Sequence, residues 1–294
     1  IYYGWMLGAA EMLRFGIAGT NDMYFSGEAL ARAVIDSGVK ANLSLAVTCF
    51  GEDDYSALPA AREAEALFAD YDGAAEGRLK IDLSVHGEYT STERVARGAA
   101  AHAARLGCGM HVHLSETEAE HEDCKKRHGG MTPAAYFQAA GLFDVPATAA
   151  HAVFSERSDF EIFRHHGVTV ATCPKSNLKL ASGAAPVAEM LREGVSVALG
   201  TDSVASNNLN MLEEMKVLAL AQKGVNRNPL LMKPDEVMRL ATVNGAAAMR
   251  REHCGYIEEG ACADLTVLDL SAPYMQPVHS VIDQILWSSC GTDI

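Results

Sequence analysis

The sequence lacks several features that define large classes of proteins. No apolar run reaches the roughly 20 residues that a membrane-spanning helix needs, so we expect no membrane contact. Basic residues are outnumbered, with 24 Lys and Arg against 38 Asp and Glu, for a formal net charge of -14. Because phosphate binding needs clustered Lys and Arg, we also expect no nucleic-acid partner.

Signs of secretion are missing as well. The 7 cysteines are an odd number, widely scattered, and no two of them have the Cys-x-x-Cys spacing. We therefore expect reduced thiols and a cytoplasmic location. The first residues, 1–5, contain neither an initiator Met nor the basic region of a signal peptide, and they resemble the interior of a longer chain.

Strand-like and helix-like segments alternate along the chain. Hydrophobic residues make up 49% of the sequence and charged residues 21%, as in ordinary globular proteins. Apolar periodicity predicts seven strands, with helices between them, and this alternation indicates an α/β fold with a parallel sheet. A doubly wound sheet is less favoured, because no Gly-rich phosphate loop follows an early strand. The strands are expected near residues 18, 45, 82, 111, 149, 170 and 197.

Polar residues follow several of these strands, and such residues at successive carboxyl ends are typical of a (β/α)8 barrel. Seven strands are one too few, and a helix stands first, so we expect the first strand to lie upstream of Ile1. After residue 255 the pattern changes, with strands expected at 263–269 and 280–288. We therefore predict a barrel domain over 1–254, lacking its first strand, and part of a small β-sandwich appendage over 255–294.

The segment HVHLSE (111–116) is the centre of the chemistry that we expect. In a strand, alternation places His111 and His113 on one face, and Glu116 comes where the strand should end. A neutral imidazole can bind a divalent metal, and a nearby glutamate can shuttle protons. Taken alone, the segment fits a strand whose histidines form local hydrogen bonds equally well.

Four segments together resemble the metal-dependent amidohydrolase superfamily, and within it the S-adenosylhomocysteine and 5-methylthioadenosine deaminases, which are related to triazine hydrolases. The resemblance covers nearly the whole chain, and its specificity lies in the ordered combination. The segments are HGEYTS (86–91), HVHLSE (111–116), SNLKLASGAAP (176–186) and GTDSVASNNLNMLEEM (200–215).

The resemblance implies roles for five residues. His113 and Asp202 would bind one divalent metal, with Zn²⁺ as the default and Fe²⁺ or Mn²⁺ as alternatives. Glu116 would protonate a ring nitrogen, His151 would steady the attacking water, and Asp202 would accept the water proton. His86, with Glu116 and Asp202, would contact the small-molecule substrate. The implied reaction is hydrolytic deamination of an adenine nucleoside thioether, in which metal-activated water attacks the C–NH₂ carbon and ammonia leaves. Homo-oligomers are common in this superfamily.

The sequence departs from the family in one major respect. The family's first strand ends in a His-x-His pair of metal ligands, whereas the only His-x-His here is at 111–113, on the expected fifth strand. We therefore expect the chain to be a fragment of a longer enzyme. Two other functions remain open, namely hydrolysis of another heterocycle, such as a guanine-like base or a triazine, and ligand binding by an inactive, metal-free barrel.

Simpler interpretations exist for individual residues. Asp202 could cap the following helix, His86 could be a turn residue, and His151 could be a hydrogen-bonded core histidine. We expect His111 either to support the metal ligand His113 or to pack, and Asn177 to fix a loop through hydrogen bonds. The charged run 116–128, with His121, and the pair His165–His166 are expected on solvated faces.

Overall fold

The computed structural model describes residues 1–205 and 207–294; Ser206, within the 200–215 motif, lies outside the described residues. Within each of two sheets, every strand pairs in parallel with the next along the chain: a three-stranded sheet has the order β1-β2-β3, and a five-stranded sheet has the order β4-β5-β6-β7-β8. The prediction of an α/β fold with parallel strands is confirmed. The strands are β1 Gly19–Tyr24, β2 Lys40–Leu45, β3 Leu79–Ile81, β4 Leu83–Val85, β5 Met110–Leu114, β6 Ala147–His151, β7 Thr169–Thr172 and β8 Ser196–Leu199.

Strands β3 and β4 are two halves of the single strand predicted near residue 82. Asp82 separates them, and at this point the chain changes partner from β2 to β5. The buried Asp82 carboxylate accepts hydrogen bonds from Asn42 Nδ2 at 2.9 Å and from the backbone N–H of Gly109 at 2.9 Å, and it pairs with Arg250 Nη2 at 2.5 Å. These contacts satisfy the buried charge and join β2, β5 and the end of the helical segment.

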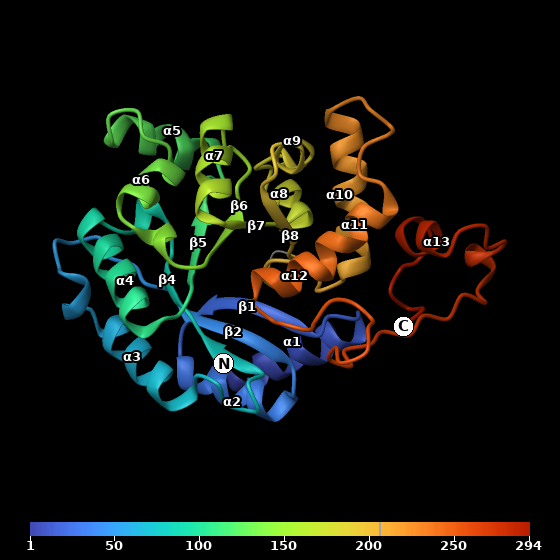
Figure 1. Cartoon of the computed structure of the whole chain (residues 1–294), viewed down its shortest axis with the longest axis horizontal. Coiled ribbons are helices and arrows are strands. Elements are labelled where there is room, and N and C mark those ends of the chain that lie inside the picture. Colours follow the sequence, from blue (N-terminus) through green and yellow to red (C-terminus); the bar gives the residue numbers. More distant parts are fainter. Residues whose placement is uncertain (206) are drawn as a thin grey trace.

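Helices cover the outer faces of both sheets (Figure 1). Helices α2 and α3 pack on the first sheet, and α4 and α9 on the second. The α-helices are α1 Tyr2–Arg14, α2 Gly27–Ser37, α3 Pro59–Tyr71, α4 Glu93–Leu106, α5 Glu118–Arg127, α6 Pro133–Ala139, α7 Arg157–His166, α8 Pro174–Lys179, α9 Val187–Arg192, α10 Met211–Val225, α11 Pro234–Ala241, α12 Val243–Ala248 and α13 Val281–Trp287. Short 3-10 helices are η1 Tyr55–Ala57, η2 Glu88–Thr90, η3 Leu142–Asp144 and η4 Pro273–Met275.

Helix α12 and the residues just after it are hydrogen-bonded to three of the strands. The Asn244 amide donates to the carbonyl of Val197 in β8 at 2.7 Å, Asn42 in β2 donates to the Met249 carbonyl at 3.3 Å, and Lys80 in β3 donates to the Arg250 carbonyl at 2.6 Å. No backbone pairing joins β1 to β8 within 1–205 and 207–294. The structure therefore contains two adjoining parallel sheets, and a closed barrel is not formed by these strands.

The predicted β appendage over 255–294 is not seen, because the structure contains no strand in this segment. Residues 280–288, expected as a strand, form α13, whose first turn is capped by the Ser280 hydroxyl. Residues 263–269 alternate as a strand would, but they have no neighbouring strand to pair with, and Leu265 and Val267 are exposed. The domain boundary at 254/255 stays a prediction.

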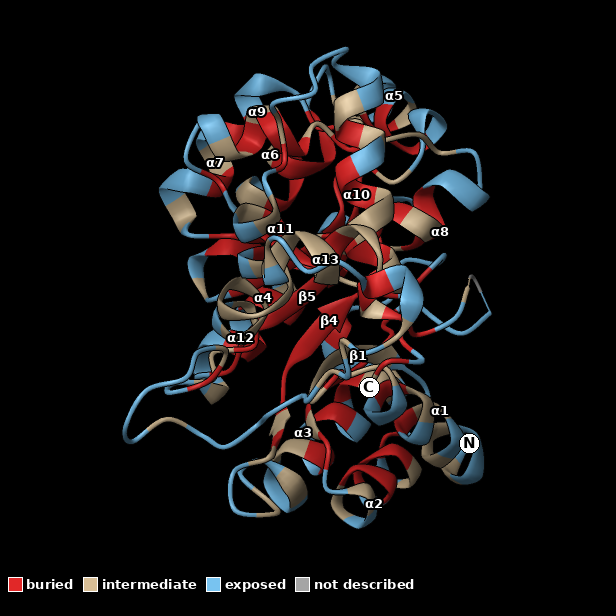
Figure 2. Ribbon diagram, turned by 90° about the vertical axis from the view of Figure 1, so that its right-hand side faces the viewer, coloured by how far each residue is buried: buried red, intermediate tan, exposed pale blue. Residues whose placement is uncertain are grey.

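Buried residues concentrate on the strands and on the helix faces that pack against them, whereas much of the C-terminal segment is exposed (Figure 2). Among the described residues, no helix combines the length and the apolar character that crossing a membrane requires. All 7 cysteines are free thiols, as predicted.

Candidate active site at the carboxyl ends of the strands

The five predicted site residues all lie at or just beyond the carboxyl ends of strands. His86 follows β4, and His151 is the last residue of β6. His113 lies in β5, and Glu116 comes two residues after the end of that strand. Asp202 comes shortly after β8. Because the strands are parallel, these ends lie at one edge of the sheets, where α/β enzymes place their catalytic residues.

Four of these side chains are brought into direct proximity. The His86 and His113 ring centroids are 4.9 Å apart, and those of His113 and His151 are 5.5 Å apart in a stacked arrangement. His151 Nε2 lies 3.8 Å from Glu116 Oε2. Burial lowers the pKa of His86, while the nearby Glu116 carboxylate acts in the opposite direction. Three imidazoles and one carboxylate therefore face a common space.

Hydrogen bonding fixes the tautomer of His113. Its Nδ1–H donates to the backbone carbonyl of His86 at 2.7 Å, which leaves Nε2 as the ring nitrogen with a free lone pair. Burial, reinforced by the neighbouring His111 and His151 rings, lowers the pKa of His113 to about 3. A neutral imidazole with its other nitrogen anchored has the form that metal-binding histidines take in proteins.

His151 is oriented in the same way by a side chain. Its Nδ1 donates to Asn177 Oδ1 at 2.9 Å, so that Nε2 is the nitrogen directed to Glu116. The sequence predicts only that Asn177 fixes a loop, whereas its side chain orients His151 from within α8. The backbone of His151 is left-handed, with φ of 72°, and so is that of Ala152, with φ of 50°. Such strained conformations are held by their surroundings and occur preferentially at functional sites.

Asp202 is connected to this group through α8. The Ser176 hydroxyl donates to Asp202 Oδ2, and Ser176 is the residue directly before Asn177. The backbone N–H of Ser203 donates to Asp202 Oδ1 at 2.6 Å, and Asp202 has a φ of 59°. One short helix thus contacts Asp202 with one residue and His151 with the next.

Asp202 does not cap the following helix. Helix α10 begins at Met211, and its N-cap is Asn210, whose side chain accepts the backbone N–H groups of Leu212 and Glu213. The simpler interpretation of Asp202 as a helix cap is therefore wrong.

The side chains at this site are of the chemical types that bind a divalent metal. Neutral imidazole and carboxylate are ligands of zinc, iron and manganese, and His113 Nε2 and the Asp202 carboxylate supply one of each. His111 adds a second imidazole on the same face of β5, 6.1 Å from His113 between centroids, and its Nδ1 is buried without a partner. His113 and Asp202 do not, however, belong to any group of three donor atoms within 4.8 Å of one another in the described part of the chain.

The turn that carries Glu116 is held by Glu120, which the sequence reasoning missed. The Glu120 carboxylate accepts the backbone N–H of Ser115 at 2.8 Å and that of Glu116 at 2.7 Å. Thr117 caps α5 and accepts the N–H of Glu120, so the pair forms a variant of the capping box. The Thr-x-x-Glu spacing at 117–120 is the signal that could have revealed this support.

The prediction that the 116–128 run is a solvated face is wrong for its inner side. His121 is 2% exposed, and Glu120 and Cys124 are also buried. His121 lies between the Ser115 hydroxyl, 3.0 Å from its Nδ1, and Glu156, 3.1 Å from its Nε2. These contacts fix α5 to Ser115 and Glu156, next to the turn that carries Glu116. The polar composition of residues 116–128 gave no sign of this burial.

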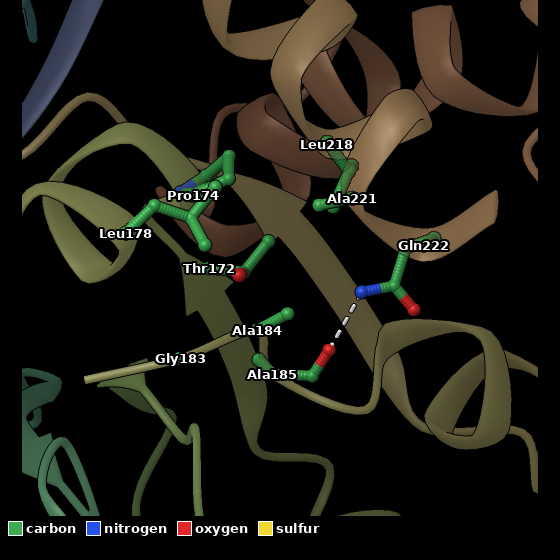
Figure 3. Close-up of a pocket in the computed structure, with 9 residues that line it drawn as sticks. All are labelled: Thr172, Pro174, Leu178, Gly183, Ala184, Ala185, Leu218, Ala221 and Gln222. Atoms are coloured by element: carbon green, nitrogen blue, oxygen red, sulfur yellow. Dashed lines mark hydrogen bonds between the residues drawn. The ribbon is translucent and has the colours of Figure 1, made fainter. Parts of the chain in front are cut away.

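A small cavity lies between α8 and α10, and no histidine lines it (Figure 3). Its volume is about 10 Å³, which is room for one water molecule at most. The Gln222 amide donates to the carbonyl of Ala185 across one side of it at 2.7 Å. This cavity is too small for an organic substrate and is a small gap in the packing between α8 and α10.

Glu214 on α10 provides a prediction about stability and pH. Its Oε2 accepts the backbone N–H of Lys175, its Oε1 is buried without a partner, and burial raises its pKa to about 8. The folded protein thus holds a proton that the unfolded chain releases above about pH 4.5, and stability falls as the pH rises from about 4.5 to about 8. In the wild type the free energy of unfolding should fall by up to about 1.4 kcal/mol per pH unit over this range, and we expect Glu214→Gln to remove that loss.

The measurement is urea unfolding of the wild type and Glu214→Gln at about pH 5 and about pH 8. The stability difference should grow in favour of the variant at the higher pH. Glu193→Gln, at an exposed position at the end of α9, is the matched control and should show no such trend. A difference that is independent of pH would mean that Glu214 is ionised in the folded protein.

Comparison with known proteins gives consistent matches. The model of the Amidohydrolase family matches residues 1–286. The 5-methylthioadenosine/S-adenosylhomocysteine deaminase of Dictyoglomus thermophilum is 38% identical over 295 residues, which cover 100% of this chain and 68% of that protein. This chain therefore spans about two thirds of the length of the curated relatives that it matches.

Two solved structures are similar in fold. A zinc-containing adenosine deaminase from Xanthomonas campestris superposes with a TM-score of 0.91 and 29% identity, over 99% of this chain and 66% of its own. The zinc-complexed atrazine chlorohydrolase of Arthrobacter aurescens gives a TM-score of 0.87 at 23% identity, over 97% of this chain and 68% of its own. The second likeness concerns the fold alone.

Proposed function

The chain belongs to the amidohydrolase family, and we propose that it deaminates an adenine nucleoside thioether by hydrolysis, with S-adenosylhomocysteine and 5-methylthioadenosine as substrates. The observation that supports this most directly is the grouping of His86, His113, His151 and Glu116 at one edge of the sheets. With β3 and β4 counted as one, the strands β1 to β8 are then seven of the eight strands of a (β/α)8 barrel, and the site lies at its carboxyl-terminal face.

The metal centre is part of this proposal. His113 Nε2 and the Asp202 carboxylate would hold one divalent metal, with zinc as the first choice because the related adenosine deaminase structure contains it. A divalent metal in this position supplies Lewis-acid activation of water for attack at neutral pH. The anchored tautomer and low pKa of His113 keep the ligand atom unprotonated.

The protein's own groups then move the protons. Asp202 accepts a proton from the attacking water, and its hydrogen bonds from Ser176 and Ser203 hold the carboxylate in one orientation. Glu116 donates a proton to the ring nitrogen next to the reacting carbon, so that this carbon can become tetrahedral. His151 Nε2 accepts a hydrogen bond from the water and directs it to that carbon. Asp202 then passes its proton to the amino group, the C–N bond breaks and ammonia leaves. Glu116 recovers a proton from the hydroxyl, which becomes the carbonyl of the product.

The space around this group is suited to an aromatic base. His86 is half-buried between His113 and Tyr89, with ring centroids 4.9 Å and 6.0 Å away. The His86 Nδ1 is tied to the Thr90 hydroxyl at 3.0 Å, which leaves Nε2 for the substrate. A purine can stack on such rings while its edge reaches Glu116.

The test is ammonia release by the zinc-loaded protein from a panel of substrates. We expect the highest kcat/KM with S-adenosylhomocysteine and 5-methylthioadenosine, with adenosine next, and little or none with guanine or an aminotriazine. A preference for guanine or the triazine would contradict the proposed substrate. Metal bound at the site without ammonia release from any substrate would contradict the proposed activity.

A further inference from the structure

A second group of potential metal ligands lies far from the strand ends that carry the histidines. Cys254, Cys262 and Asp264 each offer one donor atom, and these three atoms all lie within 4.8 Å of one another. Cys254 Sγ is 3.8 Å from Asp264 Oδ2. Asp264 also contacts Lys40, the first residue of β2, so the group lies at the amino-terminal side of the sheet.

The backbone between the two cysteines is folded so that both thiols meet. The N–H of Cys262 donates to the carbonyl of His253 at 2.7 Å, which closes the loop 254–262. Gly255 has a φ of 87°, and a Cβ there would lie 2.8 Å from the Thr242 carbonyl oxygen, so only glycine fits. The segment follows α12 and runs beside the blue N-terminal elements (Figure 1). The thiols are therefore held together by the fold and not by chance flexibility.

Asp264 is already placed to hold a cation. Lys40 Nζ lies 2.6 Å from its Oδ1 and 2.5 Å from its Oδ2. A metal bound through Oδ2, the oxygen nearest Cys254, leaves Oδ1 for Lys40, and ligating carboxylates commonly have such an outer hydrogen bond. Burial and the contact with Cys262 raise the pKa of Cys254 to about 11, while the Lys40 charge lowers it. A bound metal supplies the further positive charge that a thiolate needs there.

We propose that Cys254, Cys262 and Asp264 form a binding site for one soft divalent cation of the zinc class, with water in the fourth tetrahedral position. Two thiolates select zinc-like metals, and a carboxylate oxygen is an accepted third ligand. The third donor distinguishes this arrangement from a pair of thiols placed only to form a disulfide, which has no use for a converging carboxylate. The site is separate from the proposed catalytic metal, which has no sulfur ligand, and does not depend on the proposed function.

Cadmium alone is the probe, because its thiolate complexes absorb in the ultraviolet, whereas imidazole and carboxylate ligands give no such band. Titration of the reduced, metal-free protein with Cd²⁺ should produce a thiolate band that saturates at one ion per chain. The double variant Cys254→Ser/Cys262→Ser should lose the band. Cys290→Ser, which alters the other exposed cysteine, is the matched control and should keep it. Asp264→Asn should keep the band but bind Cd²⁺ at least about tenfold more weakly.

Three results would overturn the proposal. One is the absence of a thiolate band in the wild type, and another is a band that survives in the double variant. If the band survives in the double variant and is lost when Cys124→Ser is added, the metal is bound instead by the group formed by Glu88, Cys124 and His128. The third is a Cys254–Cys262 disulfide in the protein as purified, found by counting free thiols. Thermal unfolding of the metal-free variants checks that the substitutions leave the fold intact.

Discussion

Glu116→Gln is expected to lower kcat with S-adenosylhomocysteine by about 10²- to 10⁴-fold, the usual contribution of a general acid–base group. The substitution keeps the size and one acceptor of the side chain but removes the proton that the ring nitrogen must receive. The turn that carries residue 116 is held through its backbone N–H by Glu120, so it should keep its conformation. Steady-state ammonia release from the zinc-loaded protein measures the effect.

The pattern of the kinetic loss distinguishes chemistry from binding. Because the proton is transferred in the transition state, kcat should fall much more than KM rises. Glu118→Gln, two residues away and exposed on the first turn of α5, is the matched control and should retain wild-type kcat. A rise in KM with unchanged kcat would instead make Glu116 a residue that only binds the substrate.

Strand positions could be predicted from the sequence because apolar alternation and burial coincide in a parallel sheet. The stretch around 110–114 and that around 147–151 are bounded by Gly, Pro and polar residues, and both are strands. The division at Asp82 could not be predicted, because it reflects a change of pairing partner from β2 to β5 and a contact with Arg250, 168 positions away. Residues 263–269 alternate in the same way but do not form a strand, because they have no neighbouring strand to pair with.

The site could be predicted less completely than the fold. Residues that follow strands were found by position, and the resemblance to a family gave them roles. The supports of the site were invisible because they come from distant elements: Asn177 reaches His151 from α8, and Ser176 reaches Asp202 from the same helix. The left-handed backbone at His151 and Asp202 carries only a weak sequence signal, since His and Asp adopt it more often than most residues but far less than glycine.

His113→Ala is expected to abolish metal binding at the catalytic site and to lower activity by roughly 1000-fold or more. His113 supplies the only imidazole among the predicted ligands, and a metal contributes several kcal/mol of transition-state stabilisation, with each 1.36 kcal/mol worth about tenfold in rate. Removing the ring also deletes the Nδ1–H bond to the His86 carbonyl, which still accepts the backbone N–H of residue 113 at 3.1 Å. Elemental analysis of the purified variant and ammonia release measure the two effects.

Two further variants decide what this loss means. His165→Ala, at an exposed position on α7, is the matched control and should keep both metal and activity.

His111→Ala tests the neighbour on the same face of β5: if His113 is the ligand and His111 a packing residue, this variant keeps its metal. Zinc bound at the Cys254 group would mask the result, so the count is made in the Cys254→Ser/Cys262→Ser background. Loss of metal in His111→Ala with retention in His113→Ala would transfer the ligand role from one imidazole to the other. That exchange is physically reasonable, because His111 Nδ1 is buried without a partner and a bound cation would satisfy it.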